Sequence, residues 1–142
     1  MNSKKIKFTI SSSFENVELV GMSINKICST HFGSTDVSSQ IELCVVEACN
    51  NVIEHAYSNN PDNEFSVDLL LTATQIEITI TDTGVEKINH TSPNLEFDPN
   101  DLENLPEGGM GLFIIEQIMC QIDYYRIDGK NIFKMAKQID KK

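Results

Sequence analysis

Basic residues are scarce in this sequence. Among its 142 residues, 11 are Lys or Arg and 21 are Asp or Glu, so the formal net charge is -10 at pH 7. Nucleic acids and acidic membrane surfaces both carry phosphates, which a protein recognises with a basic face. We therefore expect neither nucleic acid nor a membrane surface as a partner. A protein partner or a metal-complexed ligand fits this charge better.

Long apolar runs and paired cysteines are also missing. No stretch approaches the roughly 20 apolar residues of a membrane span, and the basic N-terminus has no apolar signal region. We expect a cytoplasmic protein, and the length fits one domain, residues 1–142. The cysteines form no C-x-x-C pair and have apolar neighbours, so we expect small core or near-core residues at all four positions: Cys28, Cys44, Cys49 and Cys120.

Hydrophobic periodicity predicts the order of helices and strands. Alternation of apolar and polar residues predicts strands, and apolar residues at helical spacing predict three helices. The predicted strands cover residues 6–10, 65–71, 76–80, 122–127 and 131–136, and the predicted helices cover residues 14–32, 37–57 and 111–121. Two hairpins contradict the strict alternation of a doubly wound fold. We predict an α+β two-layer sandwich, with a mixed, mostly antiparallel sheet and three helices on one face.

Residues 85–107 stand apart from these elements. They contain Pro93, Pro99 and Pro106 and show little periodicity. A segment longer than roughly 12–15 residues without regular structure is usually functional or disordered. We interpret it as a lid over a binding site.

The second predicted helix carries Glu47, Asn51 and His55 four residues apart, which places them in one stripe beside its apolar face. An amide oxygen is a hard ligand for Mg²⁺ and a carboxylate accepts protons, so the stripe suits a metal next to a base. Spacing alone leaves a solvated helix face as the alternative. His55 could belong to this stripe, but a histidine beside an apolar face is more often hydrogen-bonded into the fold.

Two further motifs are weak when taken singly. Asp82-Thr83-Gly84 ends an isoleucine-rich strand, and it fits either a plain turn or an acceptor for an exocyclic amino group with a glycine at the base. Gly108-Gly109-Met110-Gly111 precedes a helix, and it fits either a hinge or an anion cradle of backbone N–H groups. No Lys-Ser or Lys-Thr follows it, so it is not a P-loop.

In this order, the motifs resemble those of the GHKL ATPase superfamily, and most closely those of the small anti-sigma-factor serine kinases. The family pattern E-A-x-T-N-x-x-x-H-[AG]-Y is met by Glu47, Ala48, Asn51, His55, Ala56 and Tyr57. The pattern G-G-x-G-L-x-x-I is met by Gly108, Gly109, Gly111, Leu112 and Ile115. The resemblance extends over nearly the whole chain and implies a histidine-kinase-like (Bergerat) fold with an ATP lid.

The resemblance also implies roles for individual residues. Glu47 would be the general base toward a serine hydroxyl, and Asn51 would hold the Mg²⁺ that bridges the phosphates of ATP. Asp82 would accept the adenine amino group, with Gly84 beneath the base. The remaining expected nucleotide contacts are His55, Gly108, Gly109, Met110, Gly111 and Leu112.

The implied function is an anti-sigma factor with serine/threonine kinase activity, which phosphorylates a STAS-type anti-anti-sigma protein and sequesters a sigma factor. The resemblance also implies a homodimer. The chain departs from the family pattern at Asn50 (usually threonine), Glu86 (often glycine) and Met110 (often arginine). Glu86 motivates the alternative of a nucleotide-gated partner-switch protein without kinase activity. A third reading is the ATP-binding half of a phosphorelay.

Overall fold

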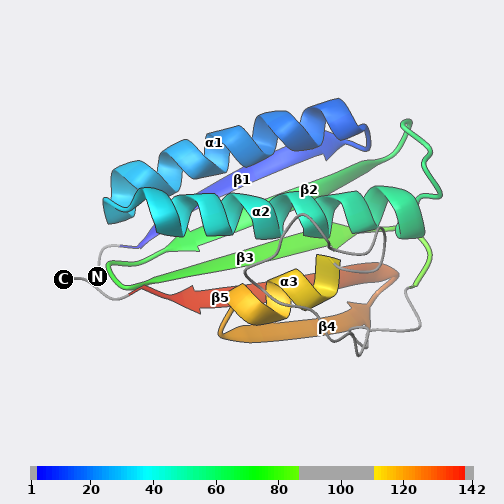
Figure 1. Ribbon diagram of the computed structural model, residues 1–142. Helices are drawn as coiled ribbons and strands as arrows, with labels where there is room; N and C mark the ends of the chain where they lie inside the picture. Colours follow the sequence, from blue (N-terminus) through cyan, green and yellow to red (C-terminus); the bar gives the residue numbers. More distant parts are fainter. Residues whose placement is uncertain (1–2, 87–110, 140–142) are drawn as a thin grey trace.

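The computed structural model describes residues 3–86 and 111–139. Figure 1 shows a sheet with the helices lying over one of its faces. In chain order the elements are β1 (Lys4–Ser11), α1 (Phe14–Phe32), α2 (Thr35–Asn51), the π-helical turn η1 (Val52–Ala56), β2 (Glu64–Leu71), β3 (Gln75–Asp82), α3 (Gly111–Ile118), β4 (Gln121–Ile127) and β5 (Lys130–Gln138). The predicted α+β two-layer sandwich is confirmed.

The five strands form one sheet in the order β1-β2-β3-β5-β4. Each of the four strand pairs is antiparallel, so the described sheet is antiparallel throughout rather than mixed as predicted. The β4–β5 turn is tight: Asp128 and Gly129 have φ angles of 51° and 76°, as a two-residue hairpin loop requires. This register places Asn131, near the start of β5, directly opposite Asp82 at the end of β3.

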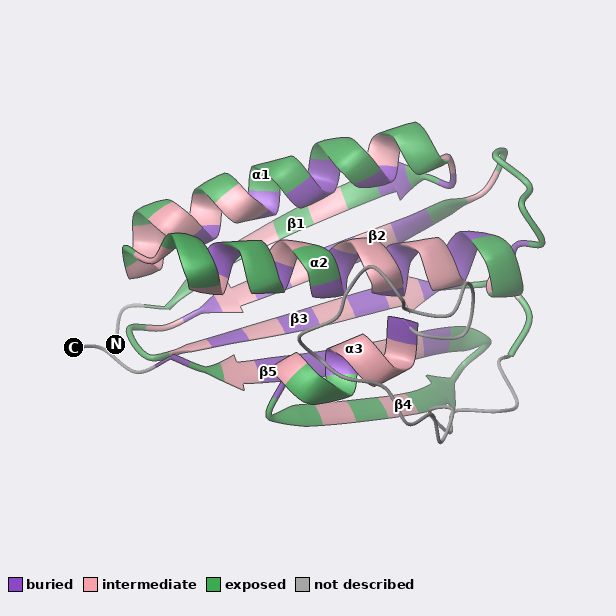
Figure 2. Ribbon diagram, viewed as in Figure 1, coloured by how far each residue is buried: buried purple, intermediate pink, exposed green. Residues whose placement is uncertain are grey.

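The hydrophobic core lies between the sheet and the helices. Inward residues of the central strands, such as Val67, Leu69, Ile78 and Ile80, are at most 2% exposed. Figure 2 shows the resulting alternation along β2 and β3, where buried segments separate intermediate ones. The opposite face carries polar side chains, including Lys134 and Glu77, which lie 3.7 Å apart as an ion pair. This one-sided burial is the pattern that the period-two alternation predicted.

Helix α1 begins and ends where the sequence predicted. Gly33 follows its last residue with a left-handed φ of 73°, and its N–H donates to the carbonyl of Ser29. Within α1, a Cβ on Gly21 would lie 2.8 Å from a γ-methyl of Val46 on α2. A glycine at this position therefore allows the two helices to approach closely. No helix among residues 3–86 and 111–139 is long and apolar enough to cross a membrane.

Three sequence-based predictions were wrong in part. The second helix does not stay α-helical to residue 57, because η1 replaces its last turn. Helix α3 ends at Ile118 rather than near residue 121, since β4 begins at Gln121. Cys28, Cys44 and Cys49 are buried as expected, but Cys120 is exposed because it lies in the short turn between α3 and β4.

Candidate functional site

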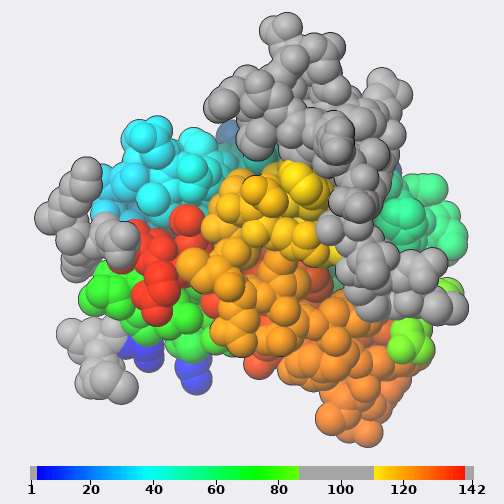
Figure 3. All heavy atoms as spheres, turned by 60° about the horizontal axis from the view of Figure 1, so that its bottom comes forward, coloured from blue at the N-terminus to red at the C-terminus, as the bar shows by residue number. Residues whose placement is uncertain are grey.

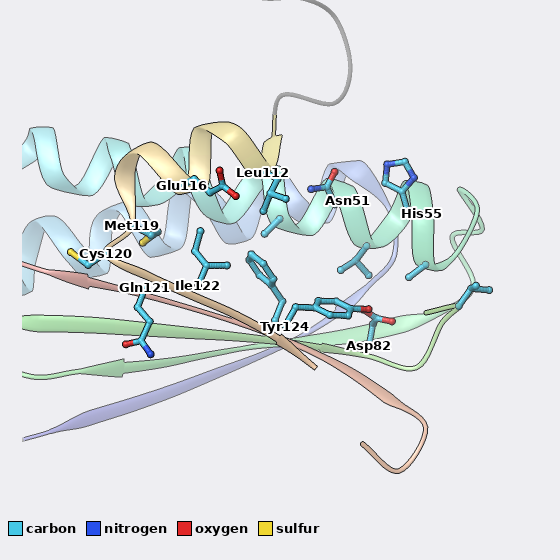
Figure 4. A pocket seen from close by; sticks show the side chains of 15 residues that line it. Asn51, His55, Asp82, Leu112, Glu116, Met119, Cys120, Gln121, Ile122 and Tyr124 are labelled. Atoms are coloured by element: carbon cyan, nitrogen blue, oxygen red, sulfur yellow. The ribbon is translucent and has the colours of Figure 1, made fainter. Parts of the chain in front are cut away.

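A cavity of about 490 Å³ lies between the helices and the sheet. Its volume falls within the range of roughly 300–1,000 Å³ that is typical of small-molecule sites. In Figure 4, Asn51 and Leu112 lie on the helical side of the cavity, and Asp82 and Tyr124 lie on the sheet side. Figure 3 shows the yellow atoms of α3 against the orange atoms of β4, so these two elements meet at the surface along this edge.

Helices α2 and α3 bring two of the predicted motifs together. A Cβ on Gly111, the first residue of α3, would lie 2.9 Å from Oε2 of Glu47 and 3.3 Å from Nδ2 of Asn51. The end of the glycine run therefore lies directly against the acid and amide pair. Asn51 and Leu112 line the cavity, whereas Glu47 lies beside it, half-buried under Gly111.

The environment of Glu47 raises the pKa of its carboxyl group. Burial is the larger cause, and the negative charge of Glu54 is the second. Both disfavour the ionised form. A carboxyl group whose pKa moves toward neutrality is a stronger base once it is ionised, which suits proton transfer.

The π-helical turn shapes the end of the cavity next to α2. The N–H of Tyr57 donates to the carbonyl of Val52, five residues earlier, and the carbonyl of Ala56 accepts from the N–H of Val85 at 2.9 Å. A Cβ on Gly84 would lie 2.3 Å from that same carbonyl oxygen. Gly84 therefore has a packing reason to be glycine, in addition to the predicted contact with a base. Turns of this kind often occur at functional sites.

His55 lies on η1 and lines the cavity, but the fold does not bury it. Its side chain is 57% exposed, and Nε2 lies 3.9 Å from a carboxylate oxygen of Glu54. It is therefore placed at the cavity edge rather than hydrogen-bonded into the core.

Asp82 is held at the sheet side of the cavity and is only 6% exposed. Its Oδ1 accepts from the backbone N–H of Gly84 at 2.9 Å and from Nδ2 of Asn131 at 2.8 Å. Burial raises the pKa of the Asp82 carboxyl group, while these hydrogen bonds and the positive charge of Arg126 oppose that rise. The side chain is an oriented, partly compensated hydrogen-bond acceptor.

Several residues of the site were missed from the sequence. The sequence predicts Asn131 only as the first residue of the last strand. It shares the inward-facing parity of Phe133, and a polar residue on the core face of a strand is a detectable signal. Glu116 and Tyr124 also line the cavity. Their strand or helix patterns contain nothing that distinguishes them from ordinary surface or core positions.

Gly108, Gly109 and Met110, together with most of the predicted lid, lie outside the described residues. The described part of the run, Gly111, adjoins Glu47 and Asn51. Within residues 3–86 and 111–139, no cluster of three or more His, Cys, Asp or Glu side chains has the geometry of a metal site. A magnesium ion at Asn51 would thus need water and phosphate oxygens as further ligands, which is the common way in which proteins bind this ion. The residues present fit a magnesium–nucleotide complex better than a bare ion.

The chain is similar to known proteins over most of its length. A family model described as the histidine kinase-like ATPase domain matches residues 10–137. Serine-protein kinase RsbW of Listeria monocytogenes serotype 4a (strain HCC23) is 29% identical, with 97% of this chain and 89% of that protein aligned. Serine-protein kinase RsbW of Staphylococcus epidermidis is 31% identical, with 96% of this chain and 87% of that protein aligned.

Solved structures share the fold. The structure of the RsbU and RsbW domains of a Mycobacterium tuberculosis protein matches 98% of this chain and 33% of its own, with a TM-score of 0.68 and 11% identity. The SiaB–SiaC complex from Pseudomonas aeruginosa contains a chain that matches 94% of this one and 89% of its own, with a TM-score of 0.64 and 13% identity. At identities of 11% and 13%, these structures support the fold assignment alone. The family model and the sequence matches establish that this chain belongs to the histidine kinase-like ATPase family, in the group of the RsbW serine-protein kinases.

Proposed function

We propose that this protein is an anti-sigma factor with ATP-dependent serine kinase activity, which transfers the γ-phosphate of ATP to a STAS-type anti-anti-sigma protein. One observation carries the proposal: Gly111, at the end of the glycine run, packs against both Glu47 and Asn51. The proposed proton acceptor and the proposed metal ligand therefore both lie next to the last residue of the proposed phosphate-binding run. The relatives in Listeria and Staphylococcus carry the name serine-protein kinase.

Glu47 is the proposed general base. It would accept the proton of the incoming serine hydroxyl as the phosphate is transferred. Its raised pKa supports this role because burial and Glu54 both make the carboxylate more basic. Glu47 is half-buried and lies beside the cavity rather than in its wall.

Asn51 is the proposed ligand for Mg²⁺. Its side chain lines the cavity one helical turn from Glu47, and the amide oxygen is the hard donor that this ion prefers. When bound, magnesium and ATP supply the charge neutralisation and the transferable phosphoryl group. Gly108, Gly109, Met110 and Gly111 would donate backbone N–H groups to the phosphates, with Leu112 and His55 at the cavity wall.

Asp82 is the proposed recognition group for adenine. It lies at the opposite side of the cavity from Asn51 and Leu112, with Oδ1 already occupied by two donors. A carboxylate in this position accepts a hydrogen bond from an exocyclic amino group. Gly84 follows directly and would lie under the base.

The proposed partners follow from the same role. The protein would bind its unphosphorylated STAS-type substrate or a sigma factor, as a homodimer in the cytoplasm, where ATP and the transcription machinery are found. The net charge of -10 supports protein partners over nucleic acid or membranes, because those surfaces require basic residues.

The direct test is phosphotransfer. The protein is incubated with γ-labelled ATP, Mg²⁺ and its STAS-domain partner, and the partner is then analysed for acid-stable phosphoserine. We expect stoichiometric labelling of one serine. A complex that forms without labelling would instead identify a nucleotide-gated binding protein, and acid-labile phosphohistidine would identify a phosphorelay.

A further inference from the structure

Asn131 is a buried polar residue on the core face of the sheet. It is 1% exposed and lies opposite Asp82 in the β3–β5 register. The next inward residues of β5, Phe133 and Met135, are apolar members of the core or pack against it. A buried amide at this position needs hydrogen-bond partners for its two N–H groups and its oxygen.

Only one orientation of the Asn131 amide group satisfies its hydrogen bonds. Nδ2 lies 2.8 Å from Oδ1 of Asp82 and 3.2 Å from the carbonyl oxygens of Gly84 and Val85. Oδ1 of Asn131 accepts from Nη1 of Arg126 at 2.7 Å. A flipped amide would set its oxygen against three acceptors and its NH₂ against a guanidinium, so this orientation is fixed.

Arg126 completes a chain of donors that ends at the cavity. Its Nη1 also lies 3.3 Å from the carbonyl oxygen of Gly84. Hydrogen bonds therefore run from Arg126 to Asn131 and from Asn131 to Asp82, while both residues also contact the backbone that follows Asp82. The guanidinium is always charged, so it polarises the amide toward the carboxylate.

These hydrogen bonds determine which carboxylate oxygen of Asp82 can accept a hydrogen bond from a ligand. Among the described residues, both hydrogen bonds to the carboxylate reach Oδ1, which leaves Oδ2 as the oxygen available to the cavity that Asp82 lines. Donors at Oδ1 also favour the ionised carboxylate, which only accepts hydrogen bonds.

We propose that Asn131, held by Arg126, is a positioning residue that keeps Asp82 as an oriented acceptor and so makes the nucleotide site select a purine with a 6-amino group over one with a 6-oxo group. The inference rests on the proposed binding of ATP to this cavity. An ionised carboxylate accepts from the amino group of adenine but repels the oxygen of hypoxanthine. A carboxyl group that has lost its donors becomes protonated more readily and then donates to that oxygen, so the discrimination weakens.

The test compares the binding of Mg-ATP and Mg-ITP by calorimetry. The variants are Asn131→Leu, which has a branched but larger side chain without donors, and Arg126→Met, which leaves the amide in place. Lys134→Met is the control for Arg126→Met, because it also replaces one positive charge by methionine. Lys134 lies on the outer face of β5, the strand of Asn131, where it pairs with Glu77. Arg126→Lys restores the charge without the forked donor and serves as the conservative variant.

We expect the wild type to prefer ATP, and Asn131→Leu to weaken ATP binding by about 10- to 150-fold, the value of a hydrogen bond to a charged group. Binding of ITP should fall much less, so the ATP-to-ITP preference shrinks. Arg126→Met should also reduce the preference for ATP over ITP. Arg126→Lys should restore this preference in part, and Lys134→Met should leave it unchanged.

Three outcomes would overturn the inference: a wild type that binds ATP without preferring it to ITP, equal losses for both nucleotides in Asn131→Leu, or an unaltered preference in both variants. Should Asn131→Leu fail to fold, the surface variant Arg126→Met decides alone. A wild type that binds neither nucleotide would instead contradict the proposed function, so the two failures are distinguishable.

Discussion

Replacing Gly84 with alanine tests how the end of α2 fits the loop after β3. The new Cβ would lie 2.3 Å from the carbonyl oxygen of Ala56, 2.7 Å from its carbonyl carbon and 2.8 Å from its Cβ. The first two are backbone atoms, which cannot move aside by a change of rotamer. The loop must shift, and the hydrogen bond from Val85 N–H to the Ala56 carbonyl, 2.9 Å long, would be lost or lengthened.

The magnitude follows from these two effects. Overpacking of a tight site costs about 1–3 kcal/mol, and the hydrogen bond contributes about 0.5–1.5 kcal/mol. We therefore expect Gly84→Ala to lower the free energy of unfolding of the nucleotide-free protein by about 1.5–4.5 kcal/mol. Urea denaturation followed by circular dichroism measures this, provided that the slope of the transition is unchanged.

Gly21→Ala is the matched control. Its Cβ would also clash, at 2.8 Å, but with a γ-methyl of Val46, a side chain that is only partly buried. A rotamer change costs about 0.5–1.5 kcal/mol, and replacing a helical glycine returns about 1 kcal/mol. We expect little net change. Equal stability of Gly84→Ala and wild type would refute the packing role of Gly84. If Gly84→Ala were as stable as the wild type but no longer bound ATP, Gly84 would instead be needed for close contact with the adenine base.

Two further predictions concern the carboxyl groups of the site. Glu54→Gln removes a negative charge that raises the pKa of Glu47, so that pKa should fall and the acidic limb of the phosphotransfer pH profile should move to lower pH; an unmoved limb would exclude Glu47 as the titrating base. Asp82→Asn should weaken ATP binding yet stabilise the nucleotide-free protein. Burial raises the folded-state pKa of Asp82, so the contribution of this group to stability is fully present below its unfolded pKa and is lost as pH rises through the folded pKa. The difference in free energy of unfolding between Asp82→Asn and the wild type should therefore grow as the pH rises from the unfolded to the folded pKa of Asp82. Unfolding measurements that show no such growth would contradict burial as the cause of the raised pKa.

Much of the fold was accessible from the sequence because its signals are local. Strict alternation predicted β2 and β3, and alternation also predicted the two strands of the last hairpin. The π-helical turn was not accessible in this way. The carbonyl of Ala56, the last residue of this turn, accepts from Val85, which is distant in sequence, and hydrophobic periodicity contains no sign of such a contact.

The same distinction between local signals and tertiary contacts applies to the candidate site. The sequence predicts Glu47, Asn51 and Asp82 as site residues because they stand in motifs with recognisable spacing. The structure places Asn51 and Asp82 in the cavity lining and Glu47 beside it. Asn131 and Arg126 were missed, since their contribution comes from strand pairing and hydrogen bonds that no linear motif contains. The exposure of Cys120 was misjudged for a related reason, because its neighbours are apolar but the chain turns between α3 and β4.

The central claim is that Glu47 takes the proton from a serine hydroxyl while other residues bind the nucleotide. Single-turnover phosphotransfer by Glu47→Gln, measured alongside its affinity for Mg-ATP, tests this most directly. We expect the rate to fall by roughly 10²–10⁴-fold, the usual contribution of a general base, with nucleotide affinity retained. Transfer at the wild-type rate by a variant that still binds ATP would contradict the assignment.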